Sequence, residues 1–308
     1  MRELNRHIAF SGEQAMLLET AVAFCREKSP IRAVRDLLGS QNGFDTAVWQ
    51  EMAALGWLGI AIPEHHGGSG LGIAEAATIA EPMGRHLLAT PYVSTQIAIQ
   101  ALLAAGHAAW VPAIAQGMAA TTAVFEAEGD WDLGHIGARA VIAGGVARLS
   151  GAKTLVLDAA VAGVLVVSVM LEGAPALAVV PGAAARVEAG GLRAERVIDE
   201  TRRSFSLDLD GIEVPAGDVI TGAAAHAALA AIRDAGLLFA VAEAAGGIAG
   251  VLDVTVDYLN TRSTFGRKIG RYQALKHTCA DILVGLERSR SHLYHAATLC
   301  AAGHAEAE

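Results

Sequence analysis

The chain has 308 residues, of which 53% are hydrophobic and 5% aromatic, so it can bury a large core that divides into two or three units. The formal net charge is −9 and the basic residues are dispersed, which leaves no electrostatic footprint for a nucleic-acid partner. The three cysteines are widely spaced, which excludes a disulfide framework and fits a reducing compartment such as the cytoplasm.

Helical periodicity dominates the first third of the chain. Apolar residues recur at helical spacing in four blocks, which breakers such as Pro30, Pro63 and Pro91 separate: residues 13–27, 45–56, 73–87 and 94–106. The Ala-rich composition favours helices whose axes approach closely. The sequence therefore predicts an N-terminal α-helical domain over residues 1–118.

A different pattern begins near residue 119. Short apolar or alternating runs bounded by Gly, Asp and Pro replace the helical blocks. In one of them, Phe205, Leu207 and Leu209 alternate with polar residues and share one face of a strand. This pattern predicts a middle β domain over residues 119–218, a small antiparallel barrel or sandwich.

Neither an export signal nor a membrane span is predicted. The N-terminal residues lack the apolar segment of a signal peptide. The longest apolar run, residues 159–171, is shorter than the roughly 20 residues that a membrane helix requires. We interpret this run as a buried strand and expect a cytoplasmic protein.

Two long helices follow the β domain. Residues 223–262 show a helical pattern without a proline, and residues 273–308 show a second one. They predict a C-terminal α-helical domain over residues 219–308 and a mostly α fold with a central β domain. The second pattern stops at "AEAE" without a stop signal, so we expect an incomplete bundle, either because the chain pairs with another or because it is a fragment. The apolar positions expected to be uncovered are Leu275, Ile282, Leu286 and Leu293.

The segment "NTRSTFGRKIGRYQ" between these helices is suited to holding an anion. Arg262 can contact a phosphate through two N–H groups, Thr264 adds a hydroxyl, and Gly266 permits a close backbone approach. Phe265 offers a flat face on which an aromatic ring can stack. The alternative is a solvated basic loop at a helix C-terminus, which the helix dipole also favours.

This segment resembles the flavin-binding turn of the acyl-CoA dehydrogenase family. The matching residues, 262–277, read R-x-T-F-G-R-x-I-G-x-x-Q-A-L-K-H. Residues 55–85, with "PE", a glycine-rich loop and "GLG", resemble the family's N-terminal signature, and residues 199–220 resemble its passage from the sheet domain to the long helix. Its departures from the family pattern, described below, resemble those of divergent members from sterol and side-chain catabolism, in which two unlike subunits share each flavin site.

The resemblance implies FAD as the cofactor, held between the sheet domain and the C-terminal helices, with its adenine end gripped by a neighbouring subunit. By motif position, Arg262 meets the pyrophosphate and Phe265 lies near the adenine. Gln273 contacts the pyrophosphate region and Thr264 hydrogen-bonds nearby. The implied assembly is a homo- or hetero-oligomer of family subunits.

The implied reaction is the α,β-dehydrogenation of an acyl-CoA thioester. A carboxylate base takes the α-proton, which hydrogen bonds to the thioester carbonyl make acidic, and the β-hydride passes to FAD. An electron-transfer flavoprotein or a similar acceptor then takes the electrons. The resemblance therefore requires a base, carbonyl donors and a flavin cleft.

The catalytic base has no clear candidate in the sequence. The resemblance implies a glutamate either in the family's last helical segments, which we expect this chain to lack, or near the start of the long helix. Gly236 and Leu237 stand at the second position, and neither can act as a base. Glu243 lies about two helical turns further along the same face and is a weak candidate, as is the shorter Asp234. We interpret Glu243 as a glutamate at a helix interface or surface.

The flavin-facing part of the predicted sheet also departs from the family. The segment "VFEAEGDWD" (124–132) stands where the family has Thr-Glu-Pro followed by Gly-Ser. Lys153, Leu155 and Leu157 stand where it has Lys, Trp and Thr, and leucine cannot donate a hydrogen bond to a flavin ring. Two hypotheses follow: a catalytic acyl-CoA dehydrogenase, or a non-catalytic partner subunit that completes a shared FAD site.

Two other kinds of site fit the sequence poorly. The glycine-rich loop "GGSGLG" (67–72) does not have the G-x-G-x-x-G spacing of a dinucleotide-binding unit. His65 with His66, and His292 with His295, lack the Glu-x-x-His partners of a metal site. No bound metal is predicted.

Overall fold

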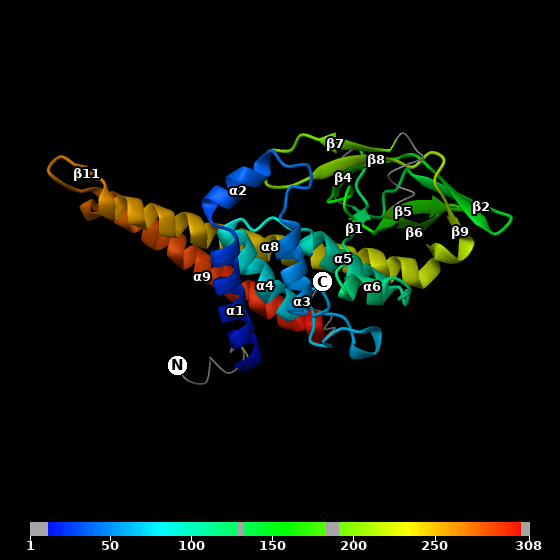
Figure 1. The fold of residues 1–308 in the computed structure, drawn as a ribbon, viewed down its shortest axis with the longest axis horizontal. Coiled ribbons are helices and arrows are strands. Elements are labelled where there is room, and N and C mark those ends of the chain that lie inside the picture. Colours follow the sequence, from blue (N-terminus) through cyan, green and yellow to red (C-terminus); the bar gives the residue numbers. More distant parts are fainter. Residues whose placement is uncertain (1–11, 128–131, 183–190, 303–308) are drawn as a thin grey trace. The chain divides into compact units, whose positions relative to one another are not determined.

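The computed structural model describes residues 12–127, 132–182 and 191–302 (Figure 1). Helices make up its first part: α1 (Gly12–Lys28), α2 (Ile31–Leu38), α3 (Thr46–Ala54), α4 (Ile73–His86), α5 (Tyr92–Ala104) and α6 (Val111–Ala115). Two longer helices end it, α8 (Gly222–Thr261) and α9 (Gln273–Ala302), and the strands lie between the two groups. The predicted fold class, mostly α with a central β domain, is confirmed. Residues 128–131 of the "VFEAEGDWD" segment and the "AEAE" end lie outside the described residues.

The strands of the central part form two sheets. The larger contains β1 (Ala120–Ala123), β2 (Arg139–Ala143), β3 (Val146–Ser150), β5 (Val164–Leu171), β6 (Ala174–Pro181), β9 (Glu213–Pro215) and β10 (Val219–Ile220). The smaller contains, in spatial order, β4 (Ala152–Leu157), β8 (Ser204–Asp208) and β7 (Leu192–Glu195). Most pairings are antiparallel, as predicted, but β5 runs parallel to β1 and β2, because other strands intervene between them in the chain.

The larger sheet is buried on both faces at its centre, β5 and β6, whereas β2 and β3 expose one side. Successive side chains along β5 and β6 point to opposite sides and enter two separate apolar clusters. One cluster, with Leu165 and Phe205, lies between the two sheets, which Figure 1 shows as separate layers. The other, with Val164 and Val166, lies against α5, α6 and the first part of α8. A strand buried on both faces is apolar at nearly every position, and β5 is apolar throughout except at Ser168, which accounts for most of the apolar run at residues 159–171.

The described chain separates into two compact units. We call one the helical unit; it contains the chain up to Val34, Ile73–Leu88 and the chain from Leu237 onward. The other, the mixed unit, contains Arg35–Gly72 and Ala89–Gly236. Helix α8 therefore contributes residues to both units. The three-domain division that the sequence suggests stays a prediction.

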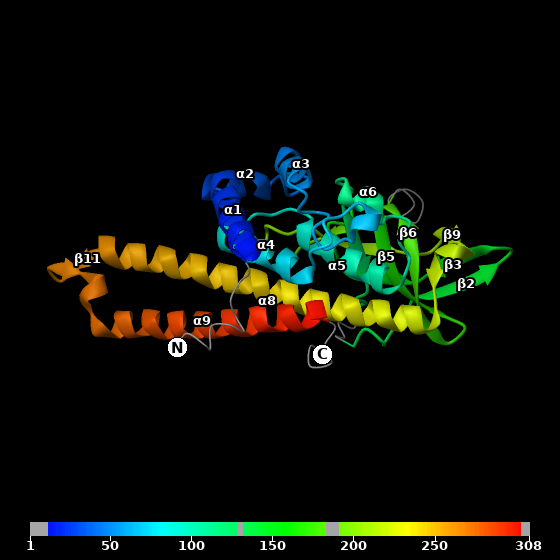
Figure 2. The ribbon, with the colours of Figure 1, turned by 90° about the horizontal axis from the view of Figure 1, so that it is seen from below.

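In the helical unit, α4 and α8 cross with their backbones almost in contact. A Cβ atom added to Gly246 would lie 1.8 Å from the carbonyl oxygen of Glu81. One added to Gly250 would lie 2.6 Å from the carbonyl oxygen of Arg85. Glycine is required at both positions because no larger residue fits between the helices. Figure 2 shows the C-terminal part of α8 and α9 side by side, joined at one end by a short hairpin.

The apolar positions of α9 are covered unevenly. Leu286 and Leu293 are only 3% and 1% exposed, so the prediction that they are uncovered is wrong. They are buried because α9 packs against α4 within the helical unit. Leu275 and Ile282, nearer to the hairpin, are 38% and 41% exposed, as predicted. The exposed apolar surface of α9 is therefore concentrated near the hairpin.

Helix α8 is the one helix of the described chain that is long and apolar enough to cross a membrane. Its most apolar window has a mean hydropathy of 1.8, and 39% of that window is buried in the protein. Ala228 and Ile232 belong to an apolar cluster of the mixed unit, and Leu252 and Leu259 are buried further along the helix. Core helices pass the same test of length and composition, so the expected lack of a membrane span stays a prediction.

Candidate functional site

A two-stranded hairpin joins α8 to α9. Its strands, β11 (Ser263–Thr264) and β12 (Arg267–Lys268), pair antiparallel around a two-residue turn of Phe265 and Gly266. The turn residues have positive φ angles, 52° and 74°, as a type I′ turn requires. Glycine adopts this conformation freely, whereas a residue with a Cβ atom does so at an energetic cost. The turn predicted from the sequence is thus a tight hairpin that presents a phenylalanine at its tip.

Side-chain contacts fix the hairpin to the helix ends. Lys268 Nζ donates a hydrogen bond to the carbonyl oxygen of Thr261 at 2.6 Å, at the C-terminus of α8. The guanidinium of Arg267 stacks on the ring of Tyr272, 4.1 Å from its centroid. These two cations are therefore paired with groups where the hairpin meets the two helices.

The four residues predicted to contact FAD lie on this hairpin or directly after it. Arg262 is exposed, and no hydrogen-bond or ion-pair partner of its guanidinium is found among the described residues. Phe265 is 91% exposed. Gln273 is the first residue of α9, where the helix dipole favours an anion. Thr264 is half-buried, and its carbonyl oxygen accepts a hydrogen bond from Tyr272 Oη at 3.2 Å. An outward arginine, a helix N-terminus and an exposed aromatic ring fit a phosphate joined to an adenine.

The first half of α8 offers no strong base. A Cβ atom at Gly236 would meet nothing within 4 Å, so there is room there for a side chain, and Leu237 is 60% exposed. Asp234, the weaker alternative, is ion-paired with Arg233, whose Nε lies 2.7 Å from its Oδ1. The early-helix position therefore has space but no carboxylate.

Glu243 lies at the crossing of α4 and α8. A Cβ atom at Gly84 would lie 2.1 Å from the carbonyl oxygen of Glu243, so the two backbones touch at this point. The Glu243 side chain is half-buried and engaged with neighbouring groups. This placement suits a glutamate at a helix interface, and its role as a base stays a prediction.

A buried ion pair joins Lys153 and Glu126 in the mixed unit. Lys153 Nζ donates to Glu126 Oε1 at 2.6 Å and to Ser168 Oγ at 2.9 Å, and its side chain is 0% exposed. Glu126 also accepts from the backbone N–H groups of Gly137 and Ala138. Burial alone would raise the pKa of Glu126, but the bonds from Lys153 and these N–H groups hold it below its usual value. For Lys153, burial outweighs the pairing and lowers the pKa.

The strand after Lys153 carries Leu155 and Leu157, which replace the family's Trp and Thr. Leu155 is 47% exposed, and Leu157 is half-buried and pairs with Ser204 on β8. Glu195, which was not predicted as a site residue, lies on β7 at the opposite edge of the smaller sheet, and its carboxylate accepts from the Leu155 amide. An acidic residue among arginines reads locally as a solvated charge, so no sequence signal marks it.

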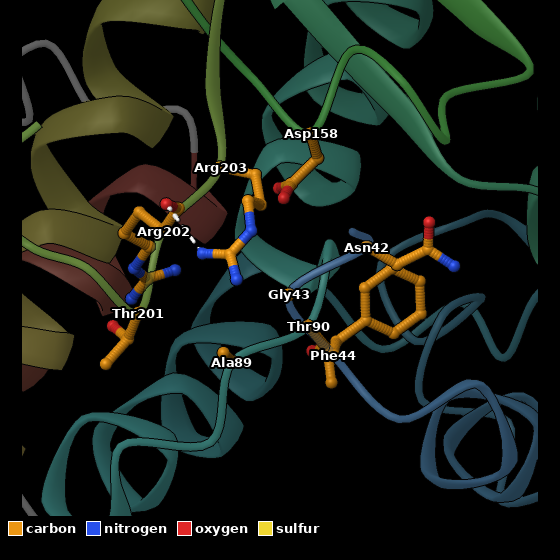
Figure 3. Close-up of a pocket in the computed structure, with 9 residues that line it drawn as sticks. All are labelled: Asn42, Gly43, Phe44, Ala89, Thr90, Asp158, Thr201, Arg202 and Arg203. Carbon is orange, nitrogen blue, oxygen red and sulfur yellow. Dashed lines mark hydrogen bonds between the residues drawn. The ribbon is translucent and has the colours of Figure 1, made fainter. Parts of the chain in front are cut away.

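A small, solvent-open recess lies in the mixed unit (Figure 3). The guanidinium of Arg203, which lines it, donates from Nη2 to the carbonyl oxygens of Leu37, Leu38 and Ser40 at 2.9–3.0 Å. These carbonyls belong to the end of α2, so Arg203 acts as its C-terminal cap. A Cβ atom at Gly43 would lie 2.7 Å from Arg203 Cγ, which fixes that glycine. The recess is a structural junction between α2 and the segment before β8.

Among the described residues, the paired histidines and the glycine-rich loop are not placed to bind a metal or a nucleotide. No group of three or more His, Cys, Asp or Glu side chains in the described part of the chain lies close enough to hold a metal ion. The rings of His65 and His66 lie 4.1 Å apart beside the glycine-rich loop. A Cβ atom at Gly68 would lie 2.1 Å from the carbonyl oxygen of Ile62, so the loop needs its glycine to fold back on the preceding chain.

Two family models match the chain. The one described as acyl-CoA dehydrogenase, N-terminal domain, matches residues 11–120, and the one described as acyl-CoA dehydrogenase, C-terminal domain, matches residues 236–308. The glycine-rich loop falls within the first match, and the hairpin falls within the second.

Individual proteins agree with these matches. The chain is 27% identical to acyl-CoA dehydrogenase IpdE2 of Mycolicibacterium smegmatis, over 91% of this chain and 75% of that protein. Among solved structures, a variant of the Tcur3481–Tcur3483 steroid ACAD has a TM-score of 0.82 and 30% identity, over 96% of this chain and 80% of that one. The ChsE4–ChsE5 complex from Mycobacterium tuberculosis has a TM-score of 0.83 at 24% identity, over 96% of this chain and 79% of that one, so it is similar in fold.

Proposed function

The chain belongs to the acyl-CoA dehydrogenase family of oxidoreductases, and we propose that it takes part in the FAD-dependent α,β-dehydrogenation of an acyl-CoA thioester. One observation carries the proposal: the hairpin offers Arg262, the face of Phe265 and the N-terminus of α9 on a single exposed turn. FAD supplies, when bound, the two-electron acceptor of the reaction. Arg262 would contact its pyrophosphate through two N–H groups, and Phe265 would stack near its adenine.

The length of α8 supports a flavin site shared between subunits. Leu237, at the position where family members carry an early base, and Thr261, at the hairpin, both belong to the helical unit and to one continuous helix. At 1.5 Å per residue they are about 36 Å apart, which exceeds the length of an extended FAD molecule. One FAD therefore cannot reach both ends within a chain, and we assign the hairpin to the FAD of a neighbouring subunit. The similar ChsE4–ChsE5 structure is that of a complex.

Arg262→Ala tests the assignment of the hairpin. We expect FAD retention to fall at least about tenfold, because a charge-assisted contact worth roughly 1.5–3 kcal/mol is removed. Arg271→Ala is the matched control, since Arg271 is an exposed arginine between the hairpin and α9 at a position that the flavin motif leaves open. FAD occupancy is measured by visible absorbance after gel filtration. Equal retention in the two variants would remove Arg262 from the site.

A second candidate function is a non-catalytic partner subunit that completes an FAD site shared with another polypeptide. The absence of a carboxylate at Gly236 and Leu237 favours it, as do the leucines at 155 and 157. Under either function the substrate class we propose is a steroid-derived acyl-CoA, because the similar solved structure is a steroid ACAD. We also propose that an electron-transfer flavoprotein or a similar acceptor takes the electrons, and that the protein is cytoplasmic.

Anaerobic reduction distinguishes the two functions. We expect the chain alone, supplied with FAD and a range of acyl-CoA thioesters, not to bleach the flavin, since Glu243 lies about 10 Å beyond the early-helix position. Absorbance near the flavin maximum is followed for the wild type and for Glu243→Gln. Bleaching that disappears in Glu243→Gln makes Glu243 the base and rejects the partner-subunit function. Gly236→Glu places a carboxylate where a side chain has room, and bleaching in that variant alone shows that only the base was missing.

A further inference from the structure

Strand β4 is irregular at its centre. Its pairing with β8 shifts in register between Lys153 and Val156, and Leu155 between them has a φ angle of 52°. This left-handed region disfavours residues with a Cβ atom, and leucine enters it less readily than glycine or asparagine. Such a conformation persists only where the surroundings hold it.

The carboxylate of Glu195 holds this part of the strand. Its Oε2 accepts from the amide of Leu155 at 3.1 Å, and its Oε1 accepts from the hydroxyl of Thr154 at 2.5 Å. Oε2 also accepts from Ser204 Oγ at 2.7 Å. Because β8 lies between β7 and β4, Glu195 reaches from one edge of the smaller sheet to the other, across its register partner Ser204. One side chain thus ties all three strands together at the irregularity.

The residues before Leu155 are fixed independently. Lys153 is bound to Glu126 and Ser168, and the amide of Thr154 donates to the carbonyl oxygen of Phe125 at 3.0 Å. With this side of the strand anchored, the backbone at Leu155 is held by the hydrogen bonds that Glu195 accepts from Thr154 and Leu155. The Leu155 side chain stays 47% exposed at the sheet surface instead of turning into the core.

We propose that Glu195 is a positioning residue for the flavin-facing strand. Its carboxylate holds Leu155 in the left-handed conformation and so presents the leucine side chain as an apolar contact for the flavin ring. The inference rests on the proposed function, because residues 153–157 are assigned to the ring site by their resemblance to the family's Lys-x-Trp-x-Thr segment. It explains how a strand without ring-facing donors retains a defined contact there.

Hydrogen exchange tests the hold of Glu195 without any cofactor. In Glu195→Ala we expect the Leu155 amide to exchange at least about tenfold faster, because it loses a charged acceptor. Glu213→Ala is the matched control: Glu213 is an exposed carboxylate of the same unit, paired with Arg148 at 2.7 Å, and its loss should leave this amide unchanged. An unchanged Leu155 amide in Glu195→Ala overturns the inference whatever the cofactor does.

The flavin spectrum and midpoint potential test the positioning role. The full chain is loaded with FAD alone and together with a purified family partner, and Glu195→Ala and Leu155→Ala should shift both readouts in the same direction. Leu155→Met, which keeps an apolar side chain, and Glu213→Ala should retain the wild-type values. Unchanged readouts in Glu195→Ala and Leu155→Ala overturn the inference and leave the proposed function standing. If the wild type holds FAD neither alone nor together with the partner, the proposed function is overturned, and this inference with it.

Discussion

Glu81→Gln is expected to lower the free energy of unfolding of the helical unit by about 3 kcal/mol. The Glu81 side chain on α4 is 8% exposed, and its Oε1 accepts from Nε and Nη2 of Arg290, both at 2.7 Å. Its Oε2 accepts from the hydroxyl of Tyr294. Glutamine has the same shape but no charge, so the partly buried guanidinium loses its buried counter-ion, keeps the exposed Glu287, and faces an amide that is itself a donor.

Tyr294 cannot replace the lost charge. Burial, followed by the neighbouring Glu81 carboxylate, raises the pKa of Tyr294 well above its usual value, so the phenol stays neutral. Glu287→Gln is the matched control, because Glu287 binds the same Arg290 at 2.8 Å but is 58% exposed. We expect that control to lose less than about 1 kcal/mol. Urea unfolding followed by circular dichroism measures both, and equal losses would show that burial of Glu81 does not matter.

Glu126→Gln is expected to cost about 3–5 kcal/mol, and more than Lys153→Met. Removing the glutamate charge leaves the Lys153 ammonium, whose side chain is 0% exposed, with Ser168 as its remaining partner. Removing the lysine leaves a carboxylate that is 17% exposed and still accepts two backbone N–H groups. Glu126 therefore tolerates the loss of its partner better than Lys153 does, because it stays partly solvated and hydrogen-bonded.

Unfolding free energies of the two single variants and the double variant measure this asymmetry. Lys153→Met should recover part of the stability when added to Glu126→Gln, because it removes the unpaired buried charge. A larger loss in Lys153→Met than in Glu126→Gln would contradict the account. The pH dependence supplies a second test. Because the pKa of Glu126 is lowered in the folded chain, its stabilisation is present at neutral pH and is lost as the pH falls through the folded-state pKa, so the wild type and Glu126→Gln should converge in acid.

The sequence predicted elements whose cause is local. Helical periodicity marked α4 and α5, and a proline-free apolar pattern marked α8 almost to its ends. The Phe265–Gly266 pair marked the turn, because glycine permits the left-handed conformation that a tight hairpin needs. These features depend on residues a few positions apart, and so they can be read without the fold.

The contacts that hold each unit together depend on residues far apart in the chain. Glu81 binds Arg290 and Tyr294, more than 200 positions away, and each residue alone reads as an ordinary charge or aromatic on a helix. Glu195 binds Thr154 across 41 positions, and Arg203 caps α2 from the other end of the mixed unit's sequence. Periodicity carries no information about such partners. Leu286 and Leu293 were misjudged for the same reason, since their cover comes from α4.

The division of the chain between the two units sets the order in which they can fold during synthesis on the ribosome. The mixed unit uses no residue beyond Gly236, so it can fold while the rest of the chain is still being synthesised. The helical unit gathers α1 and α4 from the beginning of the chain but needs the second part of α8 and α9 from its end. Until α9 emerges, Glu81 on α4 has neither Arg290 nor Tyr294, and the apolar face of α4 is open. Nascent chains should therefore engage chaperones through α1 and α4, which are made early but are covered only when α8 and α9 emerge.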